Sequence, residues 1–242
     1  MAKKEKIDPV SELHGKDRTK REAFEWVSTF AQALFGVVIV FTFLIRFVTV
    51  DGQSMEKTLH HGDRLIITDV NYTPERGDIV VVHNPAERVF SGPVIKRVIA
   101  TEGESVRVDY VNRKIFVTGT DGIERELEEE YIKDVRCGDA HNCNEWGRPN
   151  LAGYYYYYEA VKESASECND NFGVIESAVF TLDKGEVFVC GDNRAHSLDS
   201  RYVGPVDERQ ILGKVLVRIL PKPSVMNHVN YVEKDGKLVV EK

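Results

Sequence analysis

The sequence is poor in cysteine, proline and positive charge. Its 242 residues include 4 cysteines and 8 prolines, and its 32 lysines and arginines are outnumbered by 39 aspartates and glutamates. These counts exclude a small disulfide-stabilised scaffold and a collagen-like chain. The net charge of −7 disfavours nucleic acid as a partner, because proteins that bind it present a basic face. With 42% hydrophobic residues, the chain is predicted to fold, and neither a disordered acidic tail nor a polytopic membrane protein fits its composition.

Long hydrophobic runs are scarce. The sequence has one clear run of this kind, which lies between Trp26 and Ile45. Its residues carry no charge, and a helix of this length spans about 30 Å, the thickness of the hydrocarbon core of a bilayer. A buried core helix should be amphipathic or shorter, and the hydrophobic region of a cleaved secretory signal should be shorter and lie nearer the N-terminus. We therefore predict one uncleaved transmembrane helix over residues 26–46.

The orientation of this helix follows from the basic residues that precede it, which are Lys16, Arg18, Lys20 and Arg21. The positive-inside rule predicts that the tail, residues 1–25, stays in the cytoplasm and that residues 47–242 are exported. The expected location is the cell membrane, with a single span and an extracytoplasmic domain. Because the exported part is acidic, we expect it to contact the lipid bilayer through apolar surface rather than charge.

The sequence of the exported part is typical of a β protein. Turn signals separate short runs rich in Val, Ile and Phe, and we predict strands at Arg64–Val70, Asp78–His83, Val94–Ala100, Ser105–Tyr110, Lys114–Thr118, Glu186–Cys190, Ile211–Leu220 and Lys237–Glu241. Strands at this spacing favour a mainly β, antiparallel and partly closed domain over a β-α-β array.

The stretch at about 124–175 does not fit that pattern. It begins with the acidic run Glu126–Glu130 and contains three cysteines and the tract Tyr154–Tyr158. We interpret it as an insertion between two β units. The tyrosines could form a membrane-interface or peptide-contact surface, although alternating tyrosines on a strand more often cover a neighbouring strand.

All four cysteines lie on the exported side, where disulfides are permitted. Cys137 and Cys143 could pair, either could pair with Cys168, or all could stay reduced in an organism without strong oxidative folding. Cys190 ends an apolar strand and is expected to be a buried free thiol. A zinc site from Cys137, His141 and Cys143 has only weak support, because the paired Cys-x-x-Cys spacing is missing. We expect no metal and no cofactor.

Ser54 follows Gly52 and Gln53 in a turn-like segment just beyond the predicted span. An exposed serine can act as a nucleophile, but it needs a base, because the free hydroxyl attacks poorly at neutral pH. Histidine is the usual base. No Gly-x-Ser-x-Gly elbow accompanies the seven histidines, although a catalytic triad is defined by geometry rather than spacing.

Lys96 is the second candidate base, and it lies inside an apolar strand. Alternation places it on the same face as Val94 and Val98, which we expect to be buried. Burial lowers the pKa of a lysine from its usual value of about 10.4, and a neutral amine can accept a serine proton. The alternative is a lysine that extends to solvent or forms a salt bridge.

A polar loop follows the strand that ends at Cys190. Asp199 and Arg201 can pair across a turn and hold the loop in shape. Ser197 could form a hydrogen bond with a lysine amine and orient it. The alternative is an ordinary loop rich in aspartate and asparagine.

Together these segments resemble the bacterial type I signal peptidases, which are membrane-bound leader peptidases with a serine and a lysine at the active site. Four stretches match in the family's order, after the expected membrane helix: Gly52–Leu59, Gly77–Val80, Ile95–Glu104 and Gly191–Val206. The resemblance covers roughly Trp26–Arg125 and Thr181–Pro221 and leaves out the insertion. It implies the signal-peptidase type of antiparallel β domain.

The resemblance also implies roles for matching residues. Ser54 matches the nucleophile and one oxyanion donor, Lys96 matches the general base, and Gly52 occupies the position where many relatives have a serine as second oxyanion donor. Met55, Val94 and Ile95 match the substrate pocket or edge. Four residues match groups that orient the lysine or shape the site: Ser197, Asp192, Asp199 and Arg201.

The implied substrates are signal peptides of exported preproteins, cleaved after small residues at sites of the Ala-x-Ala type. The bilayer and the secretion translocon are the other implied partners. Two departures from the family are visible. Lys57 stands where the family usually has proline, and Ala195-His196 stands where the family loop often has aspartate or asparagine followed by asparagine.

Three other interpretations of the sequence stand as alternatives to a bacterial type I signal peptidase. A self-cleaving repressor-type protease with a Ser–Lys pair should be soluble and carry a DNA-binding or partner domain. A eukaryotic or archaeal-type signal peptidase would have histidine in place of Lys96. The non-enzymatic alternative is an exported single-pass binding module with a degenerate, inactive peptidase site.

Overall fold

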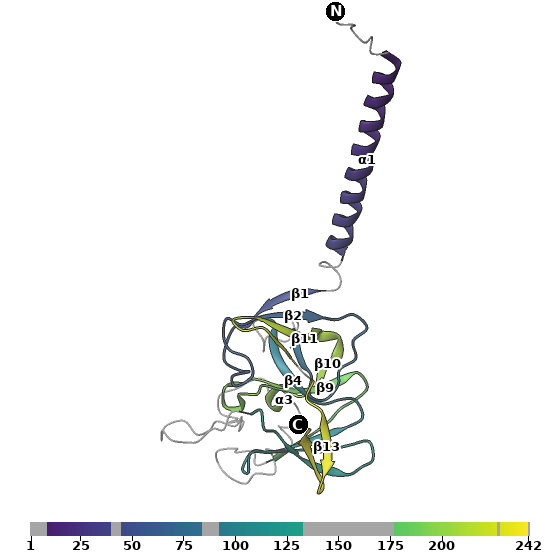
Figure 1. Cartoon of the computed structure of the whole chain (residues 1–242). Helices are drawn as coiled ribbons and strands as arrows, with labels where there is room; N and C mark the ends of the chain where they lie inside the picture. Colours follow the sequence, from purple (N-terminus) through teal and green to yellow (C-terminus); the bar gives the residue numbers. More distant parts are fainter. Residues whose placement is uncertain (1–8, 40–44, 84–91, 133–176, 227, 242) are drawn as a thin grey trace, which may run out of the picture. The chain divides into compact units, whose positions relative to one another are not determined.

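The computed structural model describes residues 9–39, 45–83, 92–132, 177–226 and 228–241 (Figure 1). The chain divides into two units, Met1–Arg46 and Phe47–Lys242. Several predicted features lie outside the described residues. They are three of the cysteines, His141 and the tyrosine tract of the insertion.

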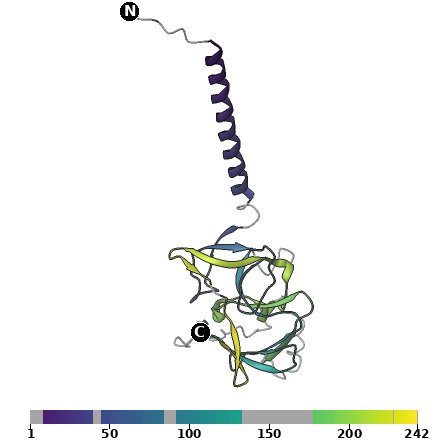
Figure 2. The same cartoon turned by 45° about the vertical axis from the view of Figure 1, so that its right-hand side comes forward.

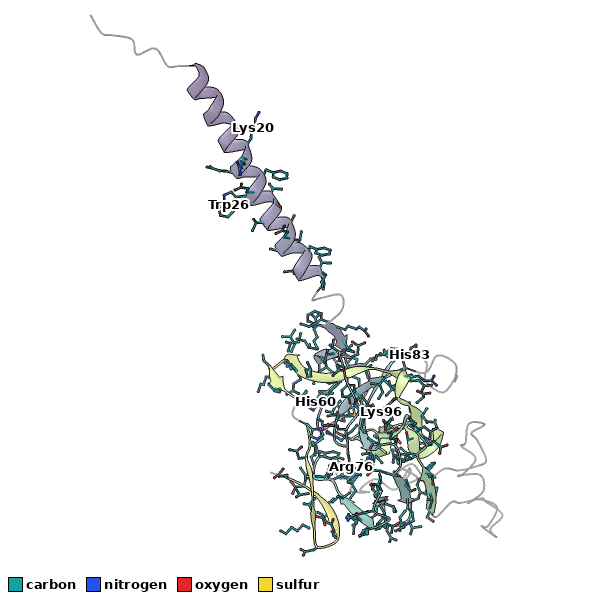
Figure 3. All side chains as sticks on the ribbon, turned by 90° about the vertical axis from the view of Figure 1, so that its right-hand side faces the viewer. Lys20, Trp26, His60, Arg76, His83 and Lys96 are labelled. Carbon is teal, nitrogen blue, oxygen red and sulfur yellow. The ribbon has the colours of Figure 1, made fainter. Side chains whose placement is uncertain are left out.

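The first unit contains one helix, α1, which extends from Pro9 to Ile39. Lys20 and Trp26 project from it as labelled in Figure 3. Among the described residues, no helix combines the length and the apolar character needed to cross a membrane. Residues 40–44 of the predicted span lie outside the described residues. Arg46, predicted to end the span, instead begins strand β1, so that boundary was wrong.

The second unit is built from two sheets. The first has the order β1-β2-β11-β3-β4-β9-β10, with β12 paired to β11. Its strands are β1 (Arg46–Thr49), β2 (Arg64–Thr68), β3 (Ile79–Val82), β4 (Val94–Ala100), β9 (Glu186–Cys190), β10 (Val206–Asp207), β11 (Ile211–Leu220) and β12 (Ser224–Val225). Three short helical turns, η2 (Arg194–His196), α3 (Ser200–Val203) and η3 (Glu208–Gln210), follow β9 and β10.

The second sheet has the order β13-β14-β7-β6-β5-β8. Its strands are β5 (Ser105–Asp109), β6 (Lys114–Thr118), β7 (Glu124–Glu128), β8 (Ser177–Thr181), β13 (Tyr231–Lys234) and β14 (Lys237–Val240). Figure 2 shows the yellow C-terminal hairpin β13–β14 beside the teal strands of this sheet. The pairs with an assigned register are antiparallel, except for β7 with β14. The predicted mainly β, antiparallel class is confirmed.

The predicted insertion begins later than expected. Glu124–Glu128 forms β7, which pairs with β6 on one side and with β14 on the other. Its acidic side chains were expected to belong to the beginning of the insertion. Instead Glu126 and Glu128 form ion pairs with lysines of the neighbouring strands, and Leu127 is buried, so the strand belongs to the sheet.

The core consists of three apolar clusters. One lies in the second sheet and extends to β9, where the Phe180 and Phe188 rings are 5.0 Å apart. Another contains Met55, Leu59 and Ile95, which places it directly under the turn that carries Ser54. Packing at this position fixes the turn against β4, the strand that carries Lys96.

Candidate active site

Ser54 lies in a tight turn between β1 and β2. The turn is closed by hydrogen bonds from the Glu56 amide to the Gln53 carbonyl (3.1 Å) and from the Leu59 amide to the Met55 carbonyl (2.8 Å). Met55 and Leu59 are both buried in the apolar cluster below, whereas Ser54 is partly exposed. These two apolar side chains, which follow the serine in the chain, therefore anchor the turn to the core.

Lys96 lies near the middle of β4, inside the β unit, as labelled in Figure 3. Its Nζ is 3.0 Å from Ser54 Oγ, within hydrogen-bonding distance. The side chain is 2% exposed, and burial lowers its pKa from 10.5 to about 8. A substantial share of the amine is therefore neutral near physiological pH, which is the form that can accept a proton.

The environment of Lys96 differs from the predicted alternation. Ile95 and Arg97, which were expected on the opposite and less buried face, are buried as well. The physical reason is that β4 lies between β3 and β9 in the middle of the sheet, with structure against both faces. A buried arginine needs a partner there, since an unpaired charge in the interior is costly.

Asp192 is that partner. Arg97 donates from Nε to Asp192 Oδ1 (2.9 Å) and from Nη2 to Asp192 Oδ2 (2.7 Å), and both side chains are buried. Burial alone would lower the pKa of Arg97, but the Asp192 carboxylate raises it above its usual value. Thr58 Oγ1 also donates to Asp192 Oδ2 at 2.5 Å. Asp192 thus joins the lysine strand, its own loop and the nucleophile turn.

The predicted ion pair of Asp199 and Arg201 is present and fully buried. Arg201 Nε lies 2.8 Å from Asp199 Oδ1, and Nη2 lies 2.9 Å from Asp199 Oδ2. Burial alone would raise the pKa of Asp199, but the Arg201 charge holds that pKa below its usual range. The Gly191 amide also donates to Asp199 (2.9 Å), so the pair fixes the start of the loop.

Asn193 contacts the nucleophile turn directly, although the sequence carried no specific signal for this role. Its amide donates to the Ser54 carbonyl (2.9 Å), and its Nδ2 donates to the Gln53 carbonyl (3.0 Å). Gly191 permits this close approach, because a Cβ there would lie 2.5 Å from the Ser54 carbonyl oxygen and 2.3 Å from Ser197 Oγ. Only the density of polar residues in the matched loop could have indicated such contacts.

The predicted hydrogen bond between Ser197 and Lys96 is not made in this structure. Ser197 is buried, and its hydroxyl lies close enough to Asp199 to help lower the pKa of that carboxyl, although it makes no hydrogen bond to Lys96. The hydroxyl instead packs beside the Cα of Gly191, at the point where a Cβ on that residue would meet it. Ser197 therefore contributes to the packing of the loop here, and Lys96 Nζ donates to Ser54 alone among the hydrogen bonds of the described residues.

The residues predicted for the oxyanion hole and for substrate binding differ in how far they are exposed. Gly52 has a φ of +101°, which favours glycine, and its amide donates to His61 Nδ1 at 3.3 Å. Met55 and Ile95 are buried in the cluster under the turn. Of the predicted substrate residues, only Val94 is partly exposed, at the start of β4.

Glu75, Asp78 and His228 form a group of potential metal ligands that includes neither Ser54 nor Lys96. The Asp78 carboxylate in this group already has other bonding partners. Asp78 Oδ1 is 2.5 Å from Lys214 Nζ and 2.7 Å from His228 Nδ1. Asp78 Oδ2 accepts from the Tyr72 hydroxyl at 2.8 Å. These partners already compensate the buried carboxylate. Cys190 is a buried free thiol, as predicted, and burial raises its pKa.

Known proteins match this sequence over most of its length. A family model described as "Signal peptidase, peptidase S26" matches residues 23–220. The chain is 29% identical over 214 residues to signal peptidase IB of Staphylococcus aureus (strain COL), which covers 87% of this chain and 96% of that relative. It is 31% identical over 200 residues to signal peptidase I P of Bacillus subtilis subsp. natto, with coverages of 81% and 88%. A crystal structure of a signal peptidase I from Enterococcus faecalis V583 is 21% identical, covers 59% of this chain and 97% of that one, and gives a TM-score of 0.33.

Proposed function

Because the chain belongs to the peptidase S26 family of signal peptidases, with bacterial type I enzymes as its relatives, we propose that it cleaves signal peptides with Ser54 as nucleophile and Lys96 as general base. The observation that carries this proposal is the 3.0 Å separation of Lys96 Nζ and Ser54 Oγ, with the amine sheltered from solvent. A buried lysine beside an accessible serine is the arrangement that a serine nucleophile requires in place of a histidine base.

The proposed reaction proceeds in two stages. Neutral Lys96 takes the Ser54 proton as Oγ attacks the scissile carbonyl, and the resulting ammonium gives that proton to the leaving amine. A water molecule, deprotonated by the same amine, then attacks the acyl-enzyme. As the ester bond breaks, the Lys96 ammonium returns the proton to Ser54 Oγ, and the signal peptide leaves with a free carboxylate. The pKa of about 8 suits both roles, because the amine can hold and release the proton near neutral pH.

The negative charge that develops on the scissile oxygen needs a donor, and we assign this role to the Ser54 amide. Gly52 is the proposed second donor. Its amide is bonded to His61 in this structure, so that bond must give way to the substrate before Gly52 can serve. At 3.3 Å and at an exposed site, it is a weak competitor.

We propose that the signal peptide binds as an extended strand beside the segments that carry Ser54 and Lys96, in the manner of β-augmentation. Val94 is partly exposed at the start of β4 and supports this path. Met55 and Ile95 form the apolar floor beneath. The proposed specificity is for small residues, of the Ala-x-Ala type, in preproteins delivered by the secretion translocon.

Membrane anchoring belongs to the same proposal. The uncharged run from Trp26 to Ile45 supports a single span within residues 26–46, and the basic residues before it support a cytoplasmic tail, residues 1–25. The catalytic domain then lies outside the cytoplasm. This arrangement brings the site to the leaflet at which exported preproteins emerge.

The decisive experiment uses the full chain in phospholipid vesicles with a preprotein that carries an Ala-x-Ala site. We expect cleavage after the second alanine, and its loss in both Ser54→Ala and Lys96→Ala. Lys237→Met, which changes a lysine on β14, serves as the control and should cleave like the wild type. Turnover by Lys96→Ala at the wild-type rate would overturn the Ser–Lys mechanism, and a folded wild type without activity would support the binding-module alternative.

A further inference from the structure

The segment Glu129–Ile132 follows β7 and contacts three separate parts of the proposed catalytic centre. The first contact comes from Lys57, three residues after Ser54 in the nucleophile turn. Lys57 Nζ donates to the carbonyls of Glu130 (2.7 Å) and Ile132 (2.8 Å). An ammonium that binds two main-chain oxygens of one segment ties the turn to that segment.

The backbone conformation of Lys57 is unusual, and it bears on the role of these two hydrogen bonds. Its φ is +88°, a strained value for a residue other than glycine. Proline, with φ fixed near −65°, could not adopt this conformation. The bonds of Lys57 to Glu130 and Ile132 help to hold the turn in it.

The second contact lies on the lysine strand. The Arg97 guanidinium sits over the ring of Tyr131, with 4.0 Å between its central carbon and the ring centroid. This is a close cation–π contact in a region with little solvent. The Tyr131 hydroxyl lies 2.5 Å from both Glu129 Oε1 and the Tyr231 hydroxyl, which fixes the ring in place. Arg97 directly follows Lys96, so the segment braces the strand next to the proposed base.

The third contact reaches the loop after β9. Glu129 accepts from both terminal nitrogens of Arg194, and the two side chains are 4% and 0% exposed. Arg194 Nε in turn donates to the Gly191 carbonyl at 2.9 Å. The adjoining Asn193 is the residue that holds the Ser54 carbonyl. The segment thus supports the nucleophile turn from a second side.

We propose that Glu129–Ile132 is a positioning strut that holds the Ser54 hydroxyl at proton-transfer distance from Lys96, with Lys57 as its exposed tie to the turn. The inference rests on the proposed function, since it assigns a role in the same reaction. Proton transfer and attack depend steeply on the placement of the reacting atoms, so loosening the turn should slow the chemical step more than it weakens substrate binding. Lys57 is a positioning residue and does not touch the reacting atoms.

The test compares four full-length proteins in phospholipid vesicles: wild type, Lys57→Met, Lys57→Arg and Lys237→Met. Methionine keeps the length of the side chain but removes the donor, whereas arginine keeps donors for the two carbonyls. Lys237→Met is the matched control, because Lys237 bonds Glu128 immediately before the strut and does not contact the turn. Since Lys57 is exposed, its loss should leave the thermal unfolding midpoint close to that of the wild type.

We expect Lys57→Met to lower kcat about tenfold with KM nearly unchanged, and Lys57→Arg to recover most of that loss. The acid limb of the pH profile should not move, because the pKa of Lys96 is set mainly by burial and by Asp199, Arg201, Cys190 and Asp192. The proposed role of the strut is contradicted by any of three results. They are a wild-type turnover rate in Lys57→Met, a Lys57→Arg variant as slow as Lys57→Met, and a shift of the acid limb in either variant. A wild type that folds but does not cleave overturns the proposed function instead.

Discussion

Arg97 and Asp192 form a two-pronged ion pair that is sealed from solvent, with N–O distances of 2.9 and 2.7 Å. The pair connects β4, which carries the proposed base, to the loop that holds the Ser54 carbonyl. Because Thr58 also donates to Asp192, the nucleophile turn is attached to the same carboxylate. One buried charge pair therefore connects three segments that are distant in sequence.

Replacing Asp192 with asparagine should destabilise the protein strongly. Asparagine keeps the shape of the side chain but leaves the buried Arg97 cation without its countercharge, which costs about 3–5 kcal/mol of unfolding free energy. Urea denaturation measures the change. Asp207→Asn is the matched control, because its partner Arg209 is 86% exposed and the pair contributes little. Equal stability of the two variants would contradict the assigned importance of the buried pair.

The pH dependence of cleavage should follow Lys96. Its pKa is lowered to about 8, so the amine is mostly protonated below that pH and cannot accept the Ser54 proton. We expect kcat/KM to rise about tenfold per pH unit on the acid side and to level off above about pH 8. Initial rates on a preprotein between pH 5 and pH 10 measure the limb. A midpoint at the ordinary lysine value would be incompatible with the observed burial.

The same lysine should reduce the stability of the fold near neutral pH. Its pKa is 10.5 in the unfolded chain and about 8 when folded, so the unfolded state binds more protons between these values. The penalty is full below pH 8 and disappears as the pH rises to about 10.5. Lys96→Met should therefore be inactive yet more stable than the wild type, by about 3 kcal/mol at pH 7.

Chemical denaturation at pH 7 and at pH 10 tests this expectation. The stability difference between Lys96→Met and the wild type should shrink at the higher pH, because the wild-type amine is then neutral in the folded state. Ser54→Ala is the matched control, since it removes the hydroxyl while leaving the lysine in place, and its stability should follow that of the wild type. A methionine variant less stable than the wild type at pH 7 would show that burial of the amine carries no such penalty.

Gly191→Ala should lower activity strongly without unfolding the β unit. The added methyl group would lie 2.5 Å from the Ser54 carbonyl oxygen and 2.3 Å from Ser197 Oγ, so the loop and the turn must separate. A displacement of this kind costs about 100-fold in kcat. Gly36→Ala on α1, where nothing lies within 4 Å of the new methyl group, provides the control. Preprotein cleavage and circular dichroism measure the two effects, and retained activity in Gly191→Ala would refute the close approach.

The sequence predicted the β class and most strands of the first sheet because short runs rich in apolar residues are bounded there by turn signals. Val94–Ala100 and Ile211–Leu220 have the predicted bounds. It failed where a strand depends on partners distant in sequence. The acidic run Glu124–Glu128 forms β7 beside lysines of β6 and β14, which pair with its glutamates, and such pairing has no local signature.

The proximity of Ser54 and Lys96 follows the family pattern, but their supporting contacts could not be read from the sequence. Alternation within β4 correctly indicated that Lys96 is buried. It could not reveal that Arg97 is buried too, because this depends on Asp192, which reaches Arg97 from the loop after β9. Asn193 and Tyr131 were missed for the same reason, since their roles arise only when remote segments meet.

The turn that carries Ser54 belongs to the first quarter of the chain, whereas Asp192, Asn193 and Arg201 belong to the last. During synthesis the hydroxyl thus leaves the ribosome long before the groups that hold it in place. A nascent chain that stops before Arg201 carries the serine without the surroundings that organise it. Any proteolytic activity of the chain therefore has to wait until the ribosome has released the segment through Arg201.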